Sequence, residues 1–442
     1  MDTRWWRTVL VAAVTVGAIP LAAPAAHAGW TDARTVSQDG WRGGSAPEVA
    51  TDREGDSLLV WNTTEDVPNG FYVRAQARTV SRTGELGPIR TVSPPDQATV
   101  SWPELAVDDD GDAVIAWSHF DPGFNGWRMY ARQLSRTGEL GPLIPLNPKE
   151  SGNDPAVAIS PAGDAVVAWH TSAPGHTAVE ARRISRTGAV SDLLDLGSHD
   201  PATPVDVAVD QRGTATVVFG ELGATPVTAR RIGPDGSLAV PLDLSLGQHN
   251  LRYYSPRIGL DRDGAATVTF QVDGSDGKRR LYGRTLPRDG APTPAVQLSP
   301  EGADLYLWGD LDTTPDGDAV VVWSTGPYLR EPNKNTTLYA RRWGRDGALT
   351  PVVNLGSGAA ARLALDDAGN GVLVNEFALV AGRNDDTGIQ LRTVDRAGTF
   401  GSPVELSRTG QTPAVGVAPQ GGSAVLWHHT DHPYPVKLVT GE

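Results

Sequence analysis

Short apolar segments recur along the chain, and each follows a glycine turn. One of them reads DAVVAW (Asp164–Trp169), with apolar residues at consecutive rather than alternating positions. Such a run is typical of a β-strand that is buried on both faces. The turn before the strand lies in stretches such as VDDDGDAVIAW (Val107–Trp117), where an Asx-Gly sequence favours a tight hairpin. The pattern predicts antiparallel strands joined by short turns.

The turn and the strand repeat with a regular period. The turn glycine recurs at intervals of 50 to 56 residues, at Gly55, Gly111, Gly163, Gly213, Gly264, Gly317, Gly369 and Gly421. Six residues after each glycine stands an aromatic residue, with one exception, at Trp61, Trp117, Trp169, Phe219, Phe270, Trp323, Asn375 and Trp427. A second hairpin follows in each unit, with an arginine six residues before its glycine, at Arg78, Arg132, Arg182, Arg230, Arg284, Arg341 and Arg392. Four antiparallel strands per unit of this length indicate a β-propeller blade.

The aspartates of the first hairpin invite a second interpretation. Asp108 to Asp112 place four carboxylates in five residues, as a calcium loop does. The equivalent positions in the third unit are Ser160 and Ala162, however, and only the glycine is kept in every unit. A glycine kept alone marks a turn position that needs positive φ. We therefore predict hairpin turns with no metal, and no cofactor elsewhere.

The two chain ends complete one another. The eighth unit stops at LVTGE (Leu438–Glu442), which lacks a fourth strand, and WTDARTVS (Trp30–Ser37) matches that strand in the other units. The sequence therefore predicts an all-β, eight-bladed β-propeller with four-stranded antiparallel blades, closed by the N-terminal strand; a linear array or a β-helix is the alternative. The expected blades span about 38–93, 94–147, 148–197, 198–245, 246–298, 299–355, 356–406 and 407–442 plus 30–37, as one domain over 29–442.

The first 28 residues read as a cleaved signal peptide. Arg4 and Arg7 precede an apolar run that is too short and too interrupted for a membrane span, and Ala26-His27-Ala28 supplies a cleavage pattern. We expect a secreted, extracellular protein with no membrane span after cleavage, and a monomer. The formal net charge of −14 argues against nucleic acid as a partner. With no cysteine in the chain, stability must come from packing and ring closure.

The units resemble those of uncharacterised secreted propeller proteins of actinobacteria. The resemblance rests on the recurring pattern PxVAxDxxGDAVxxW…ARxxSRTGxLGP and covers essentially the whole mature chain. It implies the propeller fold but no activity. The aromatic residue of a sialidase Asp-box lies three residues after its glycine, whereas the gap here is six. The kelch and WD40 signatures do not occur either, so no catalytic residue is carried over.

Variable loops are expected to gather at one end of the ring. The loops between the second and third strands and between blades differ in length, and such variation usually carries binding specificity. They supply aromatic and histidine side chains, which either stack on a ligand or cover the gaps between blades. The candidates are Trp102, Tyr254, Tyr306, Trp308, His170 and His428. The stretch HHTDH (His428–His432) is the most ligand-like cluster, although short histidine-rich loops are more often solvated than zinc-bound.

Charged residues mark the start of the first strand in most blades. Read in blade order, the position is Glu48, Glu104, Ala156, Asp206, Arg257, Asp310, Arg362 and Ala414. These residues form either a charged funnel for a substrate or a set of salt bridges between blades. Complementary neighbours favour the second, and we predict that Arg257 pairs with Asp206 or Asp310, and Arg362 with Asp310.

Two functions remain open at this point. The first is a binding module that recognises a glycan, peptide or surface protein through the variable-loop face. The second is a glycoside hydrolase or lyase that uses carboxylates at the central funnel. No catalytic motif stands out in the sequence, which favours binding over catalysis.

Overall fold

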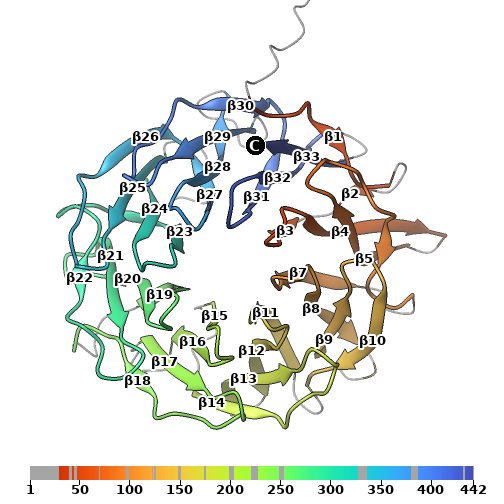
Figure 1. Cartoon of the computed structure of the whole chain (residues 1–442), viewed down its shortest axis with the longest axis horizontal. Coiled ribbons are helices and arrows are strands. Elements are labelled where there is room, and N and C mark those ends of the chain that lie inside the picture. The colour runs from red at the N-terminus through yellow and green to blue at the C-terminus, as the bar shows by residue number, and fades with distance from the viewer. Residues whose placement is uncertain are drawn as a thin grey trace, which may run out of the picture.

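The computed structural model describes residues 29–442 apart from 39–41, 44–46, 69, 96–98, 122, 124–125, 148–150, 174–175, 199–203, 221–226, 248–252, 327–335, 380–386, 432–433 and 442. The proposed signal peptide lies outside these residues. Eight antiparallel sheets are arranged as a ring around a central opening (Figure 1). The predicted eight-bladed propeller is confirmed. Among the described residues, no helix is long and apolar enough to cross a membrane.

Each blade runs up and down from the centre of the ring to its rim. The innermost strands, here called strands a, are β3 (Glu48–Thr51), β7 (Val100–Val107), β11 (Ser151–Ile159), β15 (Asp206–Val209), β19 (Tyr253–Leu260), β23 (Leu305–Thr313), β27 (Ala359–Leu365) and β31 (Gln411–Val417). Strands b follow as β4 (Ser57–Val67), β8 (Ala113–Asp121), β12 (Ala165–Ala173), β16 (Ala215–Gly220), β20 (Ala266–Asp273), β24 (Ala319–Thr325), β28 (Gly371–Ala378) and β32 (Ser423–His428).

The outer half of each blade is built in the same order. Strands c are β5 (Gly70–Val80), β9 (Gly126–Leu134), β13 (His176–Ile184), β17 (Val227–Ile232), β21 (Arg279–Leu286), β25 (Thr337–Trp343), β29 (Thr387–Val394) and β33 (Val436–Gly441). Strands d at the rim are β6 (Arg90–Thr91), β10 (Leu140–Pro145), β14 (Leu194–Ser198), β18 (Leu242–Asp243), β22 (Val296–Gln297), β26 (Val353–Ser357), β30 (Val404–Ser407) and β1 (Arg34–Thr35). The short β2 (Arg42–Gly43) adds a fifth strand to the first blade by pairing with β4.

The ring closes through the N-terminal strand, as the chain ends predicted. β1 pairs with β33 in register Arg34 to Leu438 and Thr35 to Lys437. Backbone hydrogen bonds extend the pairing on either side, from Thr31 N to Thr440 O (2.8 Å) and from Val36 N to Val436 O (3.0 Å). Val36 is fully buried among residues of the first and last blades.

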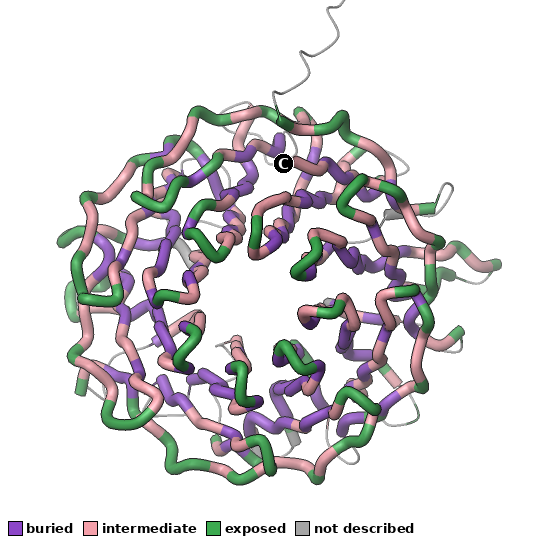
Figure 2. The backbone as a smooth tube through the Cα atoms, in the orientation of Figure 1, coloured by how far each residue is buried: buried purple, intermediate pink, exposed green. Residues whose placement is uncertain are grey.

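The core lies between neighbouring blades rather than inside any one of them, and in Figure 2 the buried residues lie mostly between the inner turns and the rim of the ring. The recurring aromatic residues anchor it: Trp61, Trp117, Trp169, Phe219, Phe270, Trp323 and Trp427 are all at most 1% exposed. Asn375, the exception in the sequence, is also fully buried and donates a hydrogen bond from Nδ2 to the carbonyl of Glu376 at 2.7 Å. The seventh blade therefore buries a hydrogen-bonded amide at the position where the other blades bury an aromatic ring.

The recurring arginines link each of the first seven blades to the blade before it. Arg132 donates from Nε to the carbonyl of Gly141 in its own blade and from Nη1 to the carbonyl of Val92 in the preceding blade, both at 2.8 Å. Bonds of the same kind run from Arg78, Arg182, Arg230, Arg284, Arg341 and Arg392. The arginine repeat is thus explained by the scaffold, because a guanidinium can bridge two carbonyls at once.

The aspartate-rich stretches are turns. Asp108 Oδ1 accepts hydrogen bonds from the backbone amides of Asp110 (3.0 Å) and Asp112 (2.9 Å), while Gly111 has φ of 86°. Asp52, Asp210 and Asp261 hold their turns through the same two bonds. Within the described part of the chain, no group of three or more His, Asp or Glu residues is placed to hold a metal ion.

This geometry predicts that calcium has no effect on stability. The Oδ1 atom of each turn aspartate already accepts two backbone amides, so an ion held by the turn would have to compete with those bonds. Melting temperatures measured with millimolar calcium and with EDTA should agree to within about a degree, whereas a specifically bound ion would raise the value by mass action. A calcium-dependent rise of several degrees would contradict the turn assignment.

Candidate functional site

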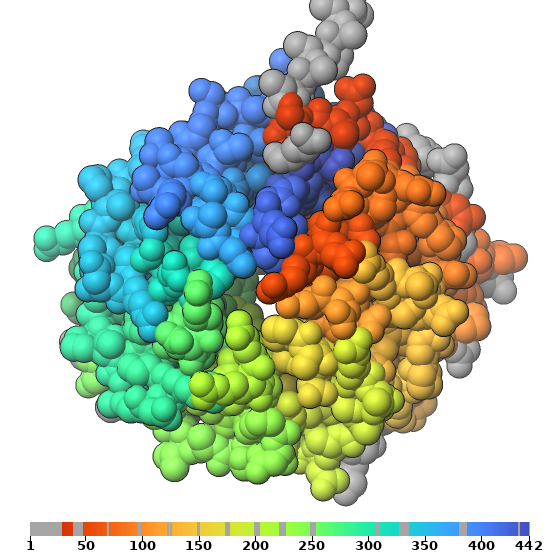
Figure 3. Space-filling model, viewed as in Figure 1, coloured from red at the N-terminus to blue at the C-terminus, as the bar shows by residue number. Residues whose placement is uncertain are grey.

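Charged side chains gather around the central channel. Strands a surround the opening of the ring, and the surface is hollowed at this point in Figure 3. Glu48, Glu104, Asp206, Arg257, Asp310 and Arg362 occupy one equivalent position on six of these strands. In blade order, Glu48 and Glu104 are neighbours with Ala414 and Ala156 beside them, and Arg257, Asp310 and Arg362 follow one another farther round the ring. The channel therefore has an acidic side and a mixed side.

The aspartates of the mixed side bind the backbone of the next blade. Asp206 Oδ2 accepts from the amide of Ile258 at 3.1 Å, and Asp310 Oδ2 accepts from the amide of Leu363 at 2.8 Å. These amides lie on strands a, the free inner edges of their sheets, where no further strand can pair with them. Each carboxylate therefore lies in the channel and accepts a hydrogen bond from an inner-edge amide that has no strand partner.

The predicted salt bridges are wrong. Among the described residues, neither Arg257 nor Arg362 lies within 4.0 Å of a carboxylate oxygen, and the hydrogen bond that Arg362 makes is to the carbonyl of Ala361 (3.3 Å). The cause is the competing role of the acids, because Asp206 and Asp310 turn toward backbone amides. Two guanidinium groups thus remain in the channel with no ion pair.

The charges nevertheless influence one another across the channel. Burial raises the pKa of Glu104 well above its usual range, and the nearby carboxylate of Glu48 raises it further. Burial also raises the pKa of Glu48, against the opposing effect of Arg362. For Arg362, burial disfavours the charge, but the carboxylates of Asp310, Glu48 and Glu104 outweigh it and raise the pKa. A protonated Glu104 can donate a hydrogen bond, which a carboxylate cannot do.

A seventh charged group lies one step deeper in the channel. Two residues past the charged position, the other blades carry only Ala or Gly, but the sixth blade carries Asp312. Its Oδ2 accepts from Leu365 N and its Oδ1 from Thr313 N, both at 2.7 Å. Burial raises its pKa to about 7, although both hydrogen bonds oppose the shift. Sequence reasoning missed Asp312, even though the contrast with alanine and glycine could have revealed it.

Asp312 should make stability depend on pH. Its folded-state pKa lies above the unfolded value, so the folded state favours the protonated form, and stability should fall as pH rises from about 4 to about 7. Asp312→Asn keeps an acceptor oxygen but does not ionise. Denaturant unfolding at pH 4.5 and pH 8 should show a loss for the wild type that exceeds the loss for the variant by on the order of 2 kcal/mol, because Glu48 and Glu104 titrate in both proteins. Parallel curves for the two proteins would contradict this assignment.

A bulge precedes the charged position on strands a. The pairing with strands b shifts register at this point in six blades. Four residues with positive φ occupy the same place, two residues before the charged position: Asp154, Ser255, Ala360 and Thr412. Bulges re-aim side chains and are common beside functional sites, and positive φ is costly for residues other than glycine. Sequence reasoning did not find this ring of bulges at the loop side of the channel.

The predicted aromatic residues are placed along these bulges. Trp102 lies in β7, and Tyr306 and Trp308 lie in β23, although their side chains are outside the described residues. Tyr254 donates a hydrogen bond from its hydroxyl to Asp273 Oδ2 (2.9 Å), and the guanidinium of Arg279 lies 4.1 Å from the centre of its ring. Tyr254 is therefore half-buried in a polar network of the fifth blade. This placement agrees with the alternative that such aromatic residues cover gaps in the scaffold and do not stack on a ligand.

The two histidines stand apart from one another. His170 ends up on β12 in the third blade and is 5% exposed, while His428 is the last residue of β32 in the eighth blade. Burial lowers the pKa of His428, and His429 lowers it further, so its imidazole is neutral at pH 7. His432, the last member of the histidine cluster, lies outside the described residues. The structure thus brings together the six charged residues of the channel but not the histidines.

Comparison with known proteins supports the fold. The chain is similar to the BP39L lectin from Burkholderia pseudomallei, with a TM-score of 0.51 and 11% identity over 83% of this chain and 99% of the lectin. The two share the propeller fold. Lower scores are found for the propeller domain of the Trilobed protease from Pyrococcus furiosus (TM-score 0.44, 11% identity, 82% of this chain and 96% of that one) and for an α-L-arabinanase from Penicillium chrysogenum (0.40, 12%, 66% and 93%). No protein-family model matches the chain, and no curated protein matches its sequence.

Proposed function

We propose that the protein is a secreted, monomeric binding module that holds an acidic glycan at the loop side of its central channel. The observation that carries the proposal is the pair Arg257 and Arg362, which share the channel without an ion pair. A guanidinium binds a carboxylate through two parallel hydrogen bonds, so such arginines suit a sugar carboxylate. The recurring scaffold arginines instead donate to backbone carbonyl groups of two blades, as Arg132 does.

The acidic side of the channel suits the rest of such a ligand. Glu48 and Glu104 can accept from or donate to sugar hydroxyl groups, depending on their protonation, and the raised pKa of Glu104 limits repulsion of an anionic ligand. Loops of variable length border this end of the channel, as expected for specificity on a regular scaffold. The similar structures include a lectin, which agrees with glycan binding without requiring it.

One observation favours catalysis as a second candidate. Glu104 and Glu48 lie on adjacent blades, and their environments push the pKa of Glu104 farther up than that of Glu48. A pair of carboxyl groups with separated pKa values is the arrangement of a general acid and a general base. In that case the protein would be a glycoside hydrolase or lyase that acts on the same acidic glycan, with Glu104 as the acid and the two arginines holding the sugar carboxylate.

A glycan array tests the proposal directly. Residues 29–442 should bind glycans that contain uronic or sialic acids, and free glucuronate should compete, while matched neutral glycans should not bind. Incubation with the bound glycan, followed by measurement of new reducing ends or unsaturated products, separates binding from catalysis. Binding confined to neutral glycans, or to protein partners, would contradict the proposed ligand class.

A further inference from the structure

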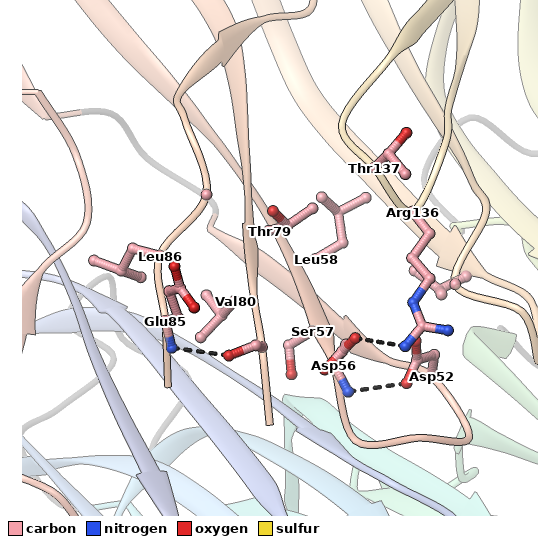
Figure 4. A pocket seen from close by; sticks show the side chains of 14 residues that line it. Asp52, Asp56, Ser57, Leu58, Thr79, Val80, Glu85, Leu86, Arg136 and Thr137 are labelled. Carbon is pink, nitrogen blue, oxygen red and sulfur yellow. Dashed lines mark hydrogen bonds and ion pairs between the residues drawn. The ribbon is translucent and has the colours of Figure 1, made fainter. Parts of the chain in front are cut away.

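A groove recurs between neighbouring blades at the end of the ring opposite the variable loops. This end carries the a–b and c–d turns, and the groove lies between the turns of one blade and those of the next. The copy between the first and second blades has a volume of about 320 Å³ (Figure 4), the copy between the second and third about 270 Å³, and the copy between the fourth and fifth about 380 Å³. The repeat of the sequence thus produces a repeated cavity.

The first two copies have the same chemistry. The groove between blades 1 and 2 is lined by Asp52, Asp56, Glu85 and Arg136, and the groove between blades 2 and 3 by Asp108, Asp112, Glu139 and Arg186. Each groove therefore sets three carboxylates against one guanidinium. Hydroxyl groups add further polar contacts, among them Ser81 in the first copy and Ser135 in the second.

One carboxylate oxygen in each of these grooves has no donor. Asp52 and Asp108 are 2% and 3% exposed, and their Oδ1 atoms hold the turn, but Oδ2 of each has no hydrogen-bond partner. The oxygen of Asp52 lies beside Gly111, where an added Cβ would approach it to 2.7 Å. A buried carboxylate oxygen without a donor is costly, and such a group calls for an explanation.

In the groove between blades 4 and 5, the equivalent carboxylate oxygen accepts a hydrogen bond from a guanidinium group. There the equivalent residue, Asp210, binds Arg288 Nη1 through Oδ2 at 2.9 Å. The arginines of the first two grooves are drawn away instead: Arg136 binds Glu54 and Asp56, and Arg186 binds Asp110 at 2.8 Å. The fourth blade has Arg212 and Thr214 where the first has Glu54 and Asp56, so nothing there competes for Arg288.

We infer that the grooves between blades 1 and 2 and between blades 2 and 3 each bind an alkylammonium or guanidinium cation. The cation donates to Asp52 Oδ2 or Asp108 Oδ2, as Arg288 donates to Asp210, and displaces the arginine stem that lies beside that oxygen. Glu85 or Glu139 lies at the groove opening. A small amine, an amino sugar or a lysine or arginine side chain of a partner would present this group. The inference does not depend on the ligand proposed for the channel.

Calorimetric titration with agmatine tests the inference, with the uncharged butylurea as the matched probe. The wild type should bind two equivalents of agmatine and no butylurea, and 0.5 M NaCl should weaken binding at least tenfold. Asp52→Asn keeps the turn acceptor and should leave one equivalent, and Asp52→Asn with Asp108→Asn should leave none. Asp210→Asn should still bind two, because its groove is filled by Arg288.

Two further measurements make the result decisive. Glu104→Gln should retain both equivalents, since agmatine bound in the acidic channel would be lost from that variant. In wild-type protein with ¹³C-labelled aspartate, agmatine should shift the carboxyl signals of Asp52 and Asp108, which does not rely on any variant folding. Agmatine that fails to bind at 10 mM, binding unchanged in the double variant, or equal binding of butylurea would each overturn the inference, whether or not the channel binds a glycan.

Discussion

Deleting residues 30–37 should cost on the order of 5 kcal/mol of stability. The deletion removes β1, the buried side chain of Val36 and the packing of Trp30 on the last blade. It also leaves β33 with an unpaired edge and Arg78 without its acceptor at the carbonyl of Val36. Large buried side chains alone contribute a few kcal/mol each.

The measurement is denaturant unfolding of residues 38–442 beside residues 29–442. A point variant, Val36→Asp, should reproduce much of the loss because it places a charge in the seam between the first and last blades. Thr31→Ala is the matched control, since its hydroxyl bonds lie at the exposed end of the seam and should matter little. An unfolding midpoint unchanged by the deletion would show that the ring does not depend on this closure.

Replacing the two channel arginines should abolish ligand binding and spare the fold. Arg257→Ala and Arg362→Ala are each expected to weaken binding of the acidic glycan by about 10- to 100-fold, the value of a charge-assisted hydrogen-bond pair, and the double variant should show no measurable binding. Stability should change by less than about 1 kcal/mol, because neither side chain has an ion pair to lose. Affinity and unfolding midpoint should be measured on the same preparations.

Arg132→Ala is the matched control for these variants. Its guanidinium links the second blade to the first, so the variant should lose stability and keep its affinity for the glycan. If Arg257→Ala instead loses stability and keeps its affinity for the glycan, the channel charges have a structural role, and the proposed site is contradicted.

The repeat made the fold predictable, and competing hydrogen bonds made the site unpredictable. Aligned glycines, aromatics and arginines indicated the blade, and the complementary ends indicated the closure that β1 makes with β33. The pairing of Arg257 with Asp206 looked equally natural from their places on adjacent blades. The predicted pairing was wrong because backbone amides on the inner edge strands bind Asp206 and Asp310 in place of the arginines. A sequence does not show which of these amides lack a strand partner.

Other features could be found only with coordinates. The bulges on strands a follow from register shifts that leave no consistent residue type, since Asp154, Ser255, Ala360 and Thr412 share only their backbone conformation. The grooves likewise depend on which acceptor an arginine chooses, as the contrast between Arg136 and Arg288 shows. The sequence placed the candidate sites at the variable loops and the central funnel, and it indicated none at the short turns of the other end.

The closure of the ring also has a consequence for the order of folding. The first seven blades each form from residues within about 60 positions of one another. In the eighth blade, the side-chain hydrogen bond between Lys437 and Thr35 joins residues 402 positions apart. Contacts of such separation form slowly, because a long loop must close before they contribute any free energy. During synthesis, the segment Trp30–Ser37 would emerge early and wait for nearly the entire chain before its partner strand appeared. We therefore expect a refolding phase that is limited by this single long-range pairing, which a circular permutant joining the two ends by a short linker would accelerate.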